Sequence, residues 1–232
     1  MLIQARFIVF ALLLLKTSLS FALPKQIRLE YEISRDGKPL AIVKESFYQD
    51  GKQYRIESIT KGIGIYALLG ERKLTSIGEV TDNGLQPTHF ELHQGDHPKK
   101  WLISDFDWQN NALIMQLKGK TKTEVLVKGT QDLASYAYQF MFNPPNASEF
   151  HIAITTGKKL KQFLYQITSQ NVSLDIGGKV YQTIHVSTVN AESNENRVLW
   201  LAPDQYFLPL KMVMTDDSGN KIEQIATMLH AE

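Results

Sequence analysis

The chain has 232 residues, with 25 basic side chains, 24 acidic side chains and no cysteine. Such a near-neutral balance gives no electrostatic footprint for nucleic acid, so we expect no nucleic-acid partner. The lack of cysteine excludes a disulfide framework, a thiolate nucleophile, Cys-ligated zinc and a lipid attached through cysteine.

The start of the chain has the order of a secretory signal peptide. Arg6 supplies a positive charge, residues 7–15 form an unbroken apolar run, and small residues end the segment at Ala22. The apolar run is shorter than the roughly 20 residues that span a bilayer, and Lys16 interrupts it. An uncleaved membrane anchor is the alternative interpretation of the same segment.

We therefore expect a cleaved signal peptide at residues 1–22 and a single β-rich exported domain at residues 23–232. Without Arg6 and Lys16 the remaining chain carries 23 basic and 24 acidic residues. It has no polybasic stretch for an anionic membrane surface and no later run of spanning length. The expected location is the bacterial periplasm, as a soluble protein without a lipid anchor and without a stable membrane span.

Alternation of apolar and polar residues is the dominant pattern after the signal peptide. Ile27, Leu29 and Tyr31 share one strand face, and Asp-Gly pairs at 36–37 and 50–51 predict hairpin turns. The pattern predicts a mainly β fold, an antiparallel meander curled into an open or closed barrel. Further strand-like runs are residues 72–80, 88–94, 100–108, 112–118, 151–156, 161–168, 172–176, 180–188, 197–202, 210–216 and 221–229.

One mid-chain segment, TQDLASYAYQFMFNPP, predicts a helix over about residues 132–142. Asp132 or Thr130 can cap its start, and two prolines at 144–145 end it. Tyr136 and Phe140 belong to its apolar side chains, so we expect the helix to pack on the sheet or to plug it.

The segment KGIGIYALLGERK interrupts the alternation with three glycines among apolar residues. It predicts either a crossover that buries itself in the core or an apolar flap at the mouth of a cavity. The candidate flap and cavity residues are Ile63, Ile65, Tyr66, Leu68, Leu69, Tyr136, Phe140 and Trp200.

Motifs for metal or catalytic chemistry are weak. His89, His93 and His97 are four residues apart, but on a strand that spacing separates them by roughly 13 Å, too far for one metal ion. Asp105 and Asp107 form a carboxylate pair that leads into turn residues. We therefore expect no metal site, no cofactor and no catalytic residue.

Four stretches together resemble a family of uncharacterised exported bacterial proteins classed only as a domain of unknown function. They are LEYEISRDGKPLAIVKESF, GLQPTHFEL, DLASYAYQF and WLAPDQYFLPLKM. The resemblance covers essentially the whole chain after the signal peptide. It implies a β-rich fold and supplies no catalytic residue, because the family has no established activity.

A second, local resemblance lies at the corner after Trp200. This corner, with Asp204, Leu208, Pro209 and Lys211, is similar to a hairpin in periplasmic lipoprotein-carrier and lipoprotein-sensor half-barrels, which hold acyl chains in an apolar cavity. Those proteins have several helices, whereas one helix is predicted here. From local turn chemistry alone, the Asp204 carboxylate is expected to accept backbone N–H bonds.

Three functional hypotheses follow. The favoured one is a non-enzymatic periplasmic protein that binds an apolar or amphipathic, lipid-like ligand in the cell envelope. The alternative is an envelope scaffolding module with a filled core and a protein partner. The remote alternative is a hydrolase that uses carboxylates and histidines, with candidates Asp105, Asp107, His89 and His93.

Overall fold

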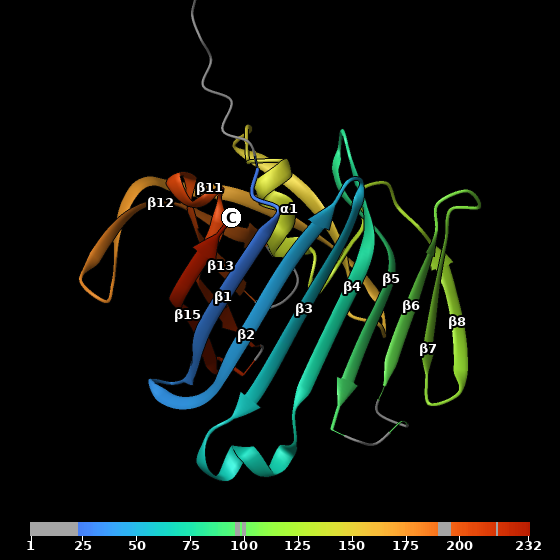
Figure 1. The fold of residues 1–232 in the computed structure, drawn as a ribbon, viewed down its shortest axis with the longest axis horizontal. Helices are drawn as coiled ribbons and strands as arrows, with labels where there is room; N and C mark the ends of the chain where they lie inside the picture. The colour runs from blue at the N-terminus through green and yellow to red at the C-terminus, as the bar shows by residue number, and fades with distance from the viewer. Residues whose placement is uncertain (1–22, 96–97, 99–100, 190–195, 217) are drawn as a thin grey trace, which may run out of the picture.

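The computed structural model describes residues 23–95, 98, 101–189, 196–216 and 218–232 (Figure 1). The predicted signal peptide and His97 lie outside these residues. Within them the chain forms one 15-stranded sheet with the order β8-β7-β6-β5-β4-β3-β2-β1-β15-β14-β13-β12-β11-β10-β9. Neighbouring strands are antiparallel except for the parallel pair β9 and β10. The mainly β prediction is confirmed, and the sheet is open rather than closed.

The strands and helices have the following bounds: β1 Gln26–Arg35, β2 Lys38–Asp50, β3 Gln53–Gly62, η1 Gly64–Leu69, β4 Arg72–Thr81, β5 Gly84–Gln94, β6 Leu102–Asp107, β7 Ala112–Leu117, β8 Lys120–Val125, β9 Gln131–Asp132, α1 Tyr136–Phe142, β10 Glu149–Thr155, β11 Leu160–Ile176, β12 Lys179–Val189, β13 Asn196–Ala202, η3 Pro203–Gln205, β14 Leu208–Thr215 and β15 Lys221–Ala231.

The sheet curls so that one face is concave, and period-two alternation places the core on that face. In β1, Ile27, Leu29 and Tyr31 are buried, while Arg28 between them is exposed. The first and last long strands pair with each other, because β1 lies between β2 and β15. This pairing joins the N-terminal and C-terminal parts of the meander into one sheet.

Helix α1 lies within the curve of the sheet, toward the upper end in Figure 1. Five of its seven residues are buried. The ring of Tyr138 stacks on Phe47 of β2, with centroids 5.5 Å apart, and the hydroxyl of Tyr136 contacts the sulfur of Met212 in β14. The helix therefore fills the upper part of the concave face with aromatic side chains.

The structure corrects the predicted start of this helix. Residues 132–135 form a short strand end and a turn, and α1 begins at Tyr136. The Asp132 carboxylate accepts the backbone N–H groups of Ala134 and Ser135 at 2.8 and 2.9 Å, which stabilises the turn instead of capping the helix. The predicted end is confirmed, since α1 stops at Phe142 before the two prolines.

The structure also overturns one of the two predictions for the glycine-containing segment KGIGIYALLGERK. This segment forms the short 3-10 helix η1 between β3 and β4, and none of the η1 residues is buried. A crossover buried in the core is therefore wrong. No helix in the described part of the chain is long and apolar enough to cross a membrane.

The corner after Trp200 holds together by a backbone bond rather than by its acid. The N–H of Phe207 donates to the carbonyl of Ala202 at 2.9 Å around η3. Asp204 is exposed, and its carboxylate accepts no hydrogen bond from the residues that the structure describes. The expected role of the Asp204 carboxylate in this turn is therefore wrong.

Candidate ligand pocket at the lower end of the sheet

A pocket of about 480 Å³ opens at the lower end of the concave face, the end at the bottom of Figure 1. This volume is within the range of about 300–1,000 Å³ that small-molecule sites occupy. Several strands end or begin here, and the turn between β10 and β11 closes one side. Its lining residues are Arg72, Leu92, Gln94, Leu102, Leu117, Lys118, Leu133, Thr156 and Lys158.

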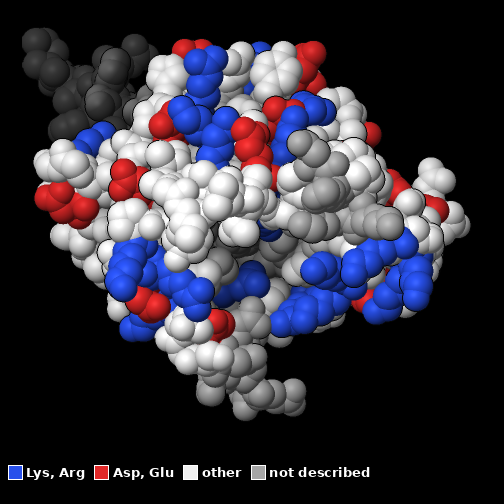
Figure 2. Space-filling model, turned by 90° about the horizontal axis from the view of Figure 1, so that it is seen from below, with Lys and Arg blue, Asp and Glu red and all other residues white. Residues whose placement is uncertain are grey.

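The pocket combines an apolar wall with three cations. Leu92 and Leu102 belong to the buried core, and Leu117 and Leu133 pack against it. Arg72 of β4, Lys118 in the turn after β7 and Lys158 in the turn after β10 line the same pocket. Figure 2 views this end from below and shows Lys and Arg side chains gathered beside a hollow. Such a surface suits a molecule with an acidic head and an apolar body.

The partly buried carboxyl of Glu45 affects the balance of positive and negative charge near the pocket. Burial raises the pKa of Glu45 to about 7, although hydrogen bonds from Ser58 and Tyr138 and the charge of Arg72 act to lower it. Ser58 donates to this carboxyl at 3.0 Å and Tyr138 at 3.4 Å. Near neutral pH a substantial fraction of Glu45 is therefore protonated, and the positive charge of Arg72 is incompletely balanced.

Arg72 is itself partly buried at the start of β4. Burial lowers its pKa and the neighbouring Glu45 charge raises it, with burial the larger effect. An arginine stays protonated in proteins despite such a shift, so Arg72 remains a cation. Its cost of desolvation would fall if an anionic group of a ligand approached it.

A buried polar network positions Leu133 at the pocket. The hydroxyl of Ser76 in β4 donates to the Asp132 carboxylate at 2.6 Å, and the hydroxyl groups of Tyr54 and Ser76 lie 3.1 Å apart. Burial raises the pKa of Asp132 to about 6, against hydrogen bonds from Ser76, Ser135 and Ala134 that lower it. The turn before α1 is thereby fixed to the middle of the sheet, and Leu133 is held against the apolar wall.

The eight residues predicted to line a cavity or its lid lie in three different places. Ile63, Ile65, Tyr66, Leu68 and Leu69 are exposed at the lower end of the molecule. Tyr136 and Phe140 are buried in α1. Phe140 lines a second pocket of about 370 Å³ beside the C-terminal end of α1, together with Asn143 and Phe150.

Trp200 lies apart from these groups. In β13 its buried neighbours Leu199 and Leu201 occupy the concave face, so Trp200 points to the outer face. There its ring meets His185 edge-on, with centroids 4.6 Å apart, and Lys211 lies 5.2 Å from the ring centre. The structure does not bring Trp200 together with α1 or with the glycine segment.

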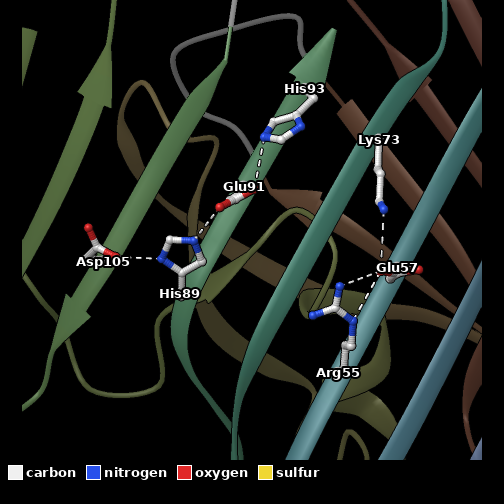
Figure 3. A network of polar contacts seen from close by, with 7 residues as sticks. All are labelled: Arg55, Glu57, Lys73, His89, Glu91, His93 and Asp105. Atoms are coloured by element: carbon white, nitrogen blue, oxygen red, sulfur yellow. Dashed lines mark hydrogen bonds and ion pairs between the residues drawn. The ribbon is translucent and has the colours of Figure 1, made fainter. Parts of the chain in front are cut away.

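The histidine and aspartate candidates form a network on the outer face of β5 and β6 (Figure 3). One ring nitrogen of His89 lies 2.6 Å from Asp105 and the other lies 2.9 Å from Glu91, which also contacts His93 at 2.9 Å. Partial burial lowers the pKa of His89, but its hydrogen bonds to Glu91 and Asp105 outweigh that effect and raise the pKa. With a carboxylate on each nitrogen, this imidazole has no free lone pair for base catalysis.

Asp107 does not join this network. Its carboxylate accepts the backbone N–H groups of Gln109 and Asn110 at 3.1 and 3.0 Å in the turn after β6. Hydrogen bonds from Asn110 lower the pKa of Asp107. Among the residues that the structure describes, no group of three or more His, Cys, Asp or Glu side chains could hold a metal ion.

The sequence did not predict the residues that line this pocket. Arg72, Leu92, Leu117, Leu133 and Lys158 are far apart in the chain, and each fits the ordinary alternation or a turn. A weak signal was the position of the lysines, since Lys118 ends a predicted strand and Lys158 falls between two predicted strands. Nothing local indicates that those two lysines face the same pocket.

Comparison with known proteins places the chain in a family. A model described as "Protein of unknown function (DUF3108)" matches residues 30–226, so the chain belongs to this family. This confirms the family resemblance drawn from the four sequence stretches. No curated protein matches the chain.

Among solved structures, a crystal structure of the LolA superfamily protein NE2245 from Nitrosomonas europaea is weakly similar. It is 9% identical, the match covers 90% of this chain and 87% of that chain, and the TM-score is 0.22. A likeness at this TM-score carries no argument about ligand or activity.

Proposed function

We propose that the protein is a non-enzymatic protein of the bacterial cell envelope that binds an amphipathic, lipid-like ligand in the lower pocket. The observation that carries the proposal is the meeting of Arg72, Lys118 and Lys158 with a leucine wall in one pocket of about 480 Å³. The acidic head of the ligand would lie beside the three cations. Its apolar chain would lie along Leu92, Leu102 and Leu117.

Export fits this role. The proposed mature chain begins at Leu23, after cleavage of a signal peptide at residues 1–22, and acts in the periplasm without a lipid anchor. In the part of the chain that the structure describes, Lys118 and Lys158 make no ion pair, so their charges are available to a ligand. A non-enzymatic role is supported by the occupied nitrogens of His89 and by the turn role of Asp107.

The test is native mass spectrometry of the protein purified from the envelope fraction of its expression host, followed by displacement of a fluorescent fatty acid. We expect a ligand-bound mass and displaceable fluorescence. Leu117→Trp should fill the pocket and abolish fatty-acid binding, while Leu117→Met keeps the volume and should bind normally. The proposal would be contradicted if the native mass shows no bound ligand and if neither the unaltered protein nor either Leu117 variant binds the fatty acid.

A scaffolding module in the envelope is the second candidate. The observation that favours it is the tight aromatic filling around α1, where Phe47, Tyr138 and Phe142 pack together. Crosslinking in intact cells distinguishes the two functions. A scaffold would be recovered with one defined protein partner and would keep that partner when Leu117→Trp blocks the pocket.

A further inference from the structure

The segment between β3 and β4 is an apolar projection, which we call the apolar tip and define as residues 63–69. Its large apolar side chains are all exposed to 40% or more of their surface: Ile63 40%, Ile65 76%, Tyr66 40%, Leu68 86% and Leu69 67%. Single exposed apolar residues are ordinary on protein surfaces, but a contiguous group marks an interaction site.

The apolar tip has a defined shape. The N–H of Ile63 donates to the carbonyl of Leu40 at 2.9 Å, and the N–H of Gly70 donates to Ala67 at 3.3 Å. A side chain at Gly62 would place its Cβ 2.2 Å from the carbonyl oxygen of Tyr66, so the chain can turn back here because this residue is glycine. The exposed leucines therefore lie in a turn whose backbone is held by hydrogen bonds.

The apolar surface continues from the tip onto the outer face of the sheet. A groove of about 270 Å³ is lined by Ile42, Ile59 and Ile63 together with Lys44 and Lys61. Lys61 pairs with Glu71 at 2.7 Å and Lys44 pairs with Glu30 at 2.8 Å, so each of these two cations has an acid beside it. Apolar side chains flanked by lysines form this part of the lower end.

On its other side the apolar tip adjoins the lower pocket. The side chain of Gln94, which lines the pocket, donates to the carbonyl of Leu69 at 3.2 Å. The pocket cations Arg72, Lys118 and Lys158 thus lie at the same end of the molecule as the exposed leucines. Figure 2 shows this end with its Lys and Arg side chains toward the viewer.

We propose that the apolar tip docks on an anionic lipid bilayer, with Ile65, Leu68 and Leu69 inserted at the boundary between head groups and acyl chains. A bilayer meets both features at once, since apolar side chains enter the boundary and the lysines beside them meet lipid phosphates. Cations near an anionic membrane surface strengthen its attraction, and burial of the apolar side chains supplies the rest of the binding. This end would then place the pocket mouth against the membrane.

This docking goes beyond the proposed function, and the side chains that it inserts, Ile65, Leu68 and Leu69, lie outside the pocket. Ligand binding depends on the interior of the pocket, whereas docking depends on side chains outside it. Each can therefore fail in an experiment while the other succeeds.

The test uses vesicles of phosphatidylglycerol and phosphatidylethanolamine, with phosphatidylcholine vesicles as the uncharged comparison. The purified protein is first shown by its mass to begin at Leu23, because a retained signal peptide would itself bind lipid. We expect flotation with the anionic vesicles and weak flotation with phosphatidylcholine. The double variant Leu68→Ser/Leu69→Ser should reduce binding by at least about tenfold, the loss expected when burial of one or two leucines is removed.

The matched control is Val125→Ser/Val180→Ser, which removes two side chains that are 76% and 58% exposed elsewhere. It should bind vesicles as the unaltered protein does. Because the chain has no cysteine, Leu68→Cys can carry a single environment-sensitive dye, with Val180→Cys as the labelled control. The dye at position 68 should shift to the blue on binding, and the dye at position 180 should not.

Three outcomes would overturn the docking proposal. One is absence of flotation by a folded protein. Another is an equal loss of vesicle binding in the control variant. The third is a dimer in sedimentation analysis that becomes a monomer in Leu68→Ser/Leu69→Ser, because the apolar tip would then contact a second copy of this chain. Leu117→Trp should leave vesicle binding unchanged even where it abolishes fatty-acid binding.

Discussion

The side-chain amide of Gln94 donates a hydrogen bond of 3.2 Å to the backbone carbonyl of Leu69. Gln94 lines the lower pocket, and Leu69 is the last residue of the apolar tip. The close approach of Gly70 to Gly95 supports the same junction, because a Cβ on Gly70 would lie 3.2 Å from the Cα of Gly95. The pocket wall and the exposed segment are thus joined by direct contact.

The first prediction concerns this junction. Gln94→Ala should speed hydrogen exchange at the amides of Tyr66 and Gly70 several-fold, because the bond that fixes the carbonyl of Leu69 is lost. The free energy of unfolding should fall by less than about 1 kcal/mol, since the bond is neutral and exposed. Gln53→Ala, which removes an exposed amide at the opposite end of the sheet, should leave exchange in residues 63–70 unchanged. Equal exchange in both variants would show that Gln94 does not hold the tip.

The second prediction concerns the charges of the pocket. Lys118→Glu/Lys158→Glu should weaken binding of an anionic fluorescent fatty acid by about tenfold or more, because attraction becomes repulsion at the pocket. Titration at low and high salt measures the effect, which should shrink as salt rises. Lys25→Glu/Lys52→Glu changes the net charge equally at the upper end and should bind almost as the unaltered protein does. A similar loss in both double variants would assign the effect to net charge rather than to the pocket.

The third prediction follows from the raised pKa of Glu45, which burial brings to about 7. An acid whose pKa is higher in the folded state favours folding when protonated. Its contribution is therefore fully present below the ordinary pKa of 4.5 and is lost as pH rises from there through about 7. Glu45→Gln mimics the protonated form. It should match the unaltered protein at pH near 4. At pH near 8 its free energy of unfolding should be higher by about 1–2 kcal/mol, a value reduced because the side chain is partly exposed.

Denaturant unfolding at several pH values measures this difference. Glu79→Gln, at an exposed position, is the control and should show no pH-dependent gain. A Glu45→Gln curve parallel to that of the unaltered protein would contradict a raised pKa.

The fourth prediction concerns the network that holds the turn before α1. Asp132→Ala should lower the free energy of unfolding by about 3 kcal/mol, because three donors in the core lose their acceptor. Those donors are Ser76 Oγ and the N–H groups of Ala134 and Ser135. Asp107→Ala removes a carboxylate that is hydrogen-bonded in an exposed turn and should lower the free energy of unfolding much less. If both variants lose the same free energy of unfolding, the buried hydrogen bonds of Asp132 stabilise the protein no more than those of an exposed turn.

Much of the fold followed from local patterns. The strands were predictable because alternation with period two is a property of neighbouring residues, and the Asp-Gly turns gave the first hairpins. The helix was recognised as an apolar segment ended by prolines, but its start was misplaced by four residues. Asp132 is a hydrogen-bond acceptor in both arrangements, and its buried partner Ser76 is 56 residues away in the chain.

The candidate site was much less predictable. The segment 63–69 was identified as unusual from its glycines and apolar residues, yet the same composition fits a buried crossover and an exposed projection. Its exposure depends on where β3 and β4 end relative to the rest of the sheet. Trp200 was grouped with α1 on the basis of its apolar strand, although the neighbouring residues Leu199 and Leu201 take the concave face.

By itself the sequence determined the β class, the turns and the presence of one apolar helix, because these depend on residues close together in the chain. The tertiary structure alone decided that the sheet stays open and that Arg72, Lys118 and Lys158 line one pocket. Burial and charge at a point in space are sums over distant segments. A lysine in one turn becomes part of a pocket when the curl of the sheet brings another turn beside it.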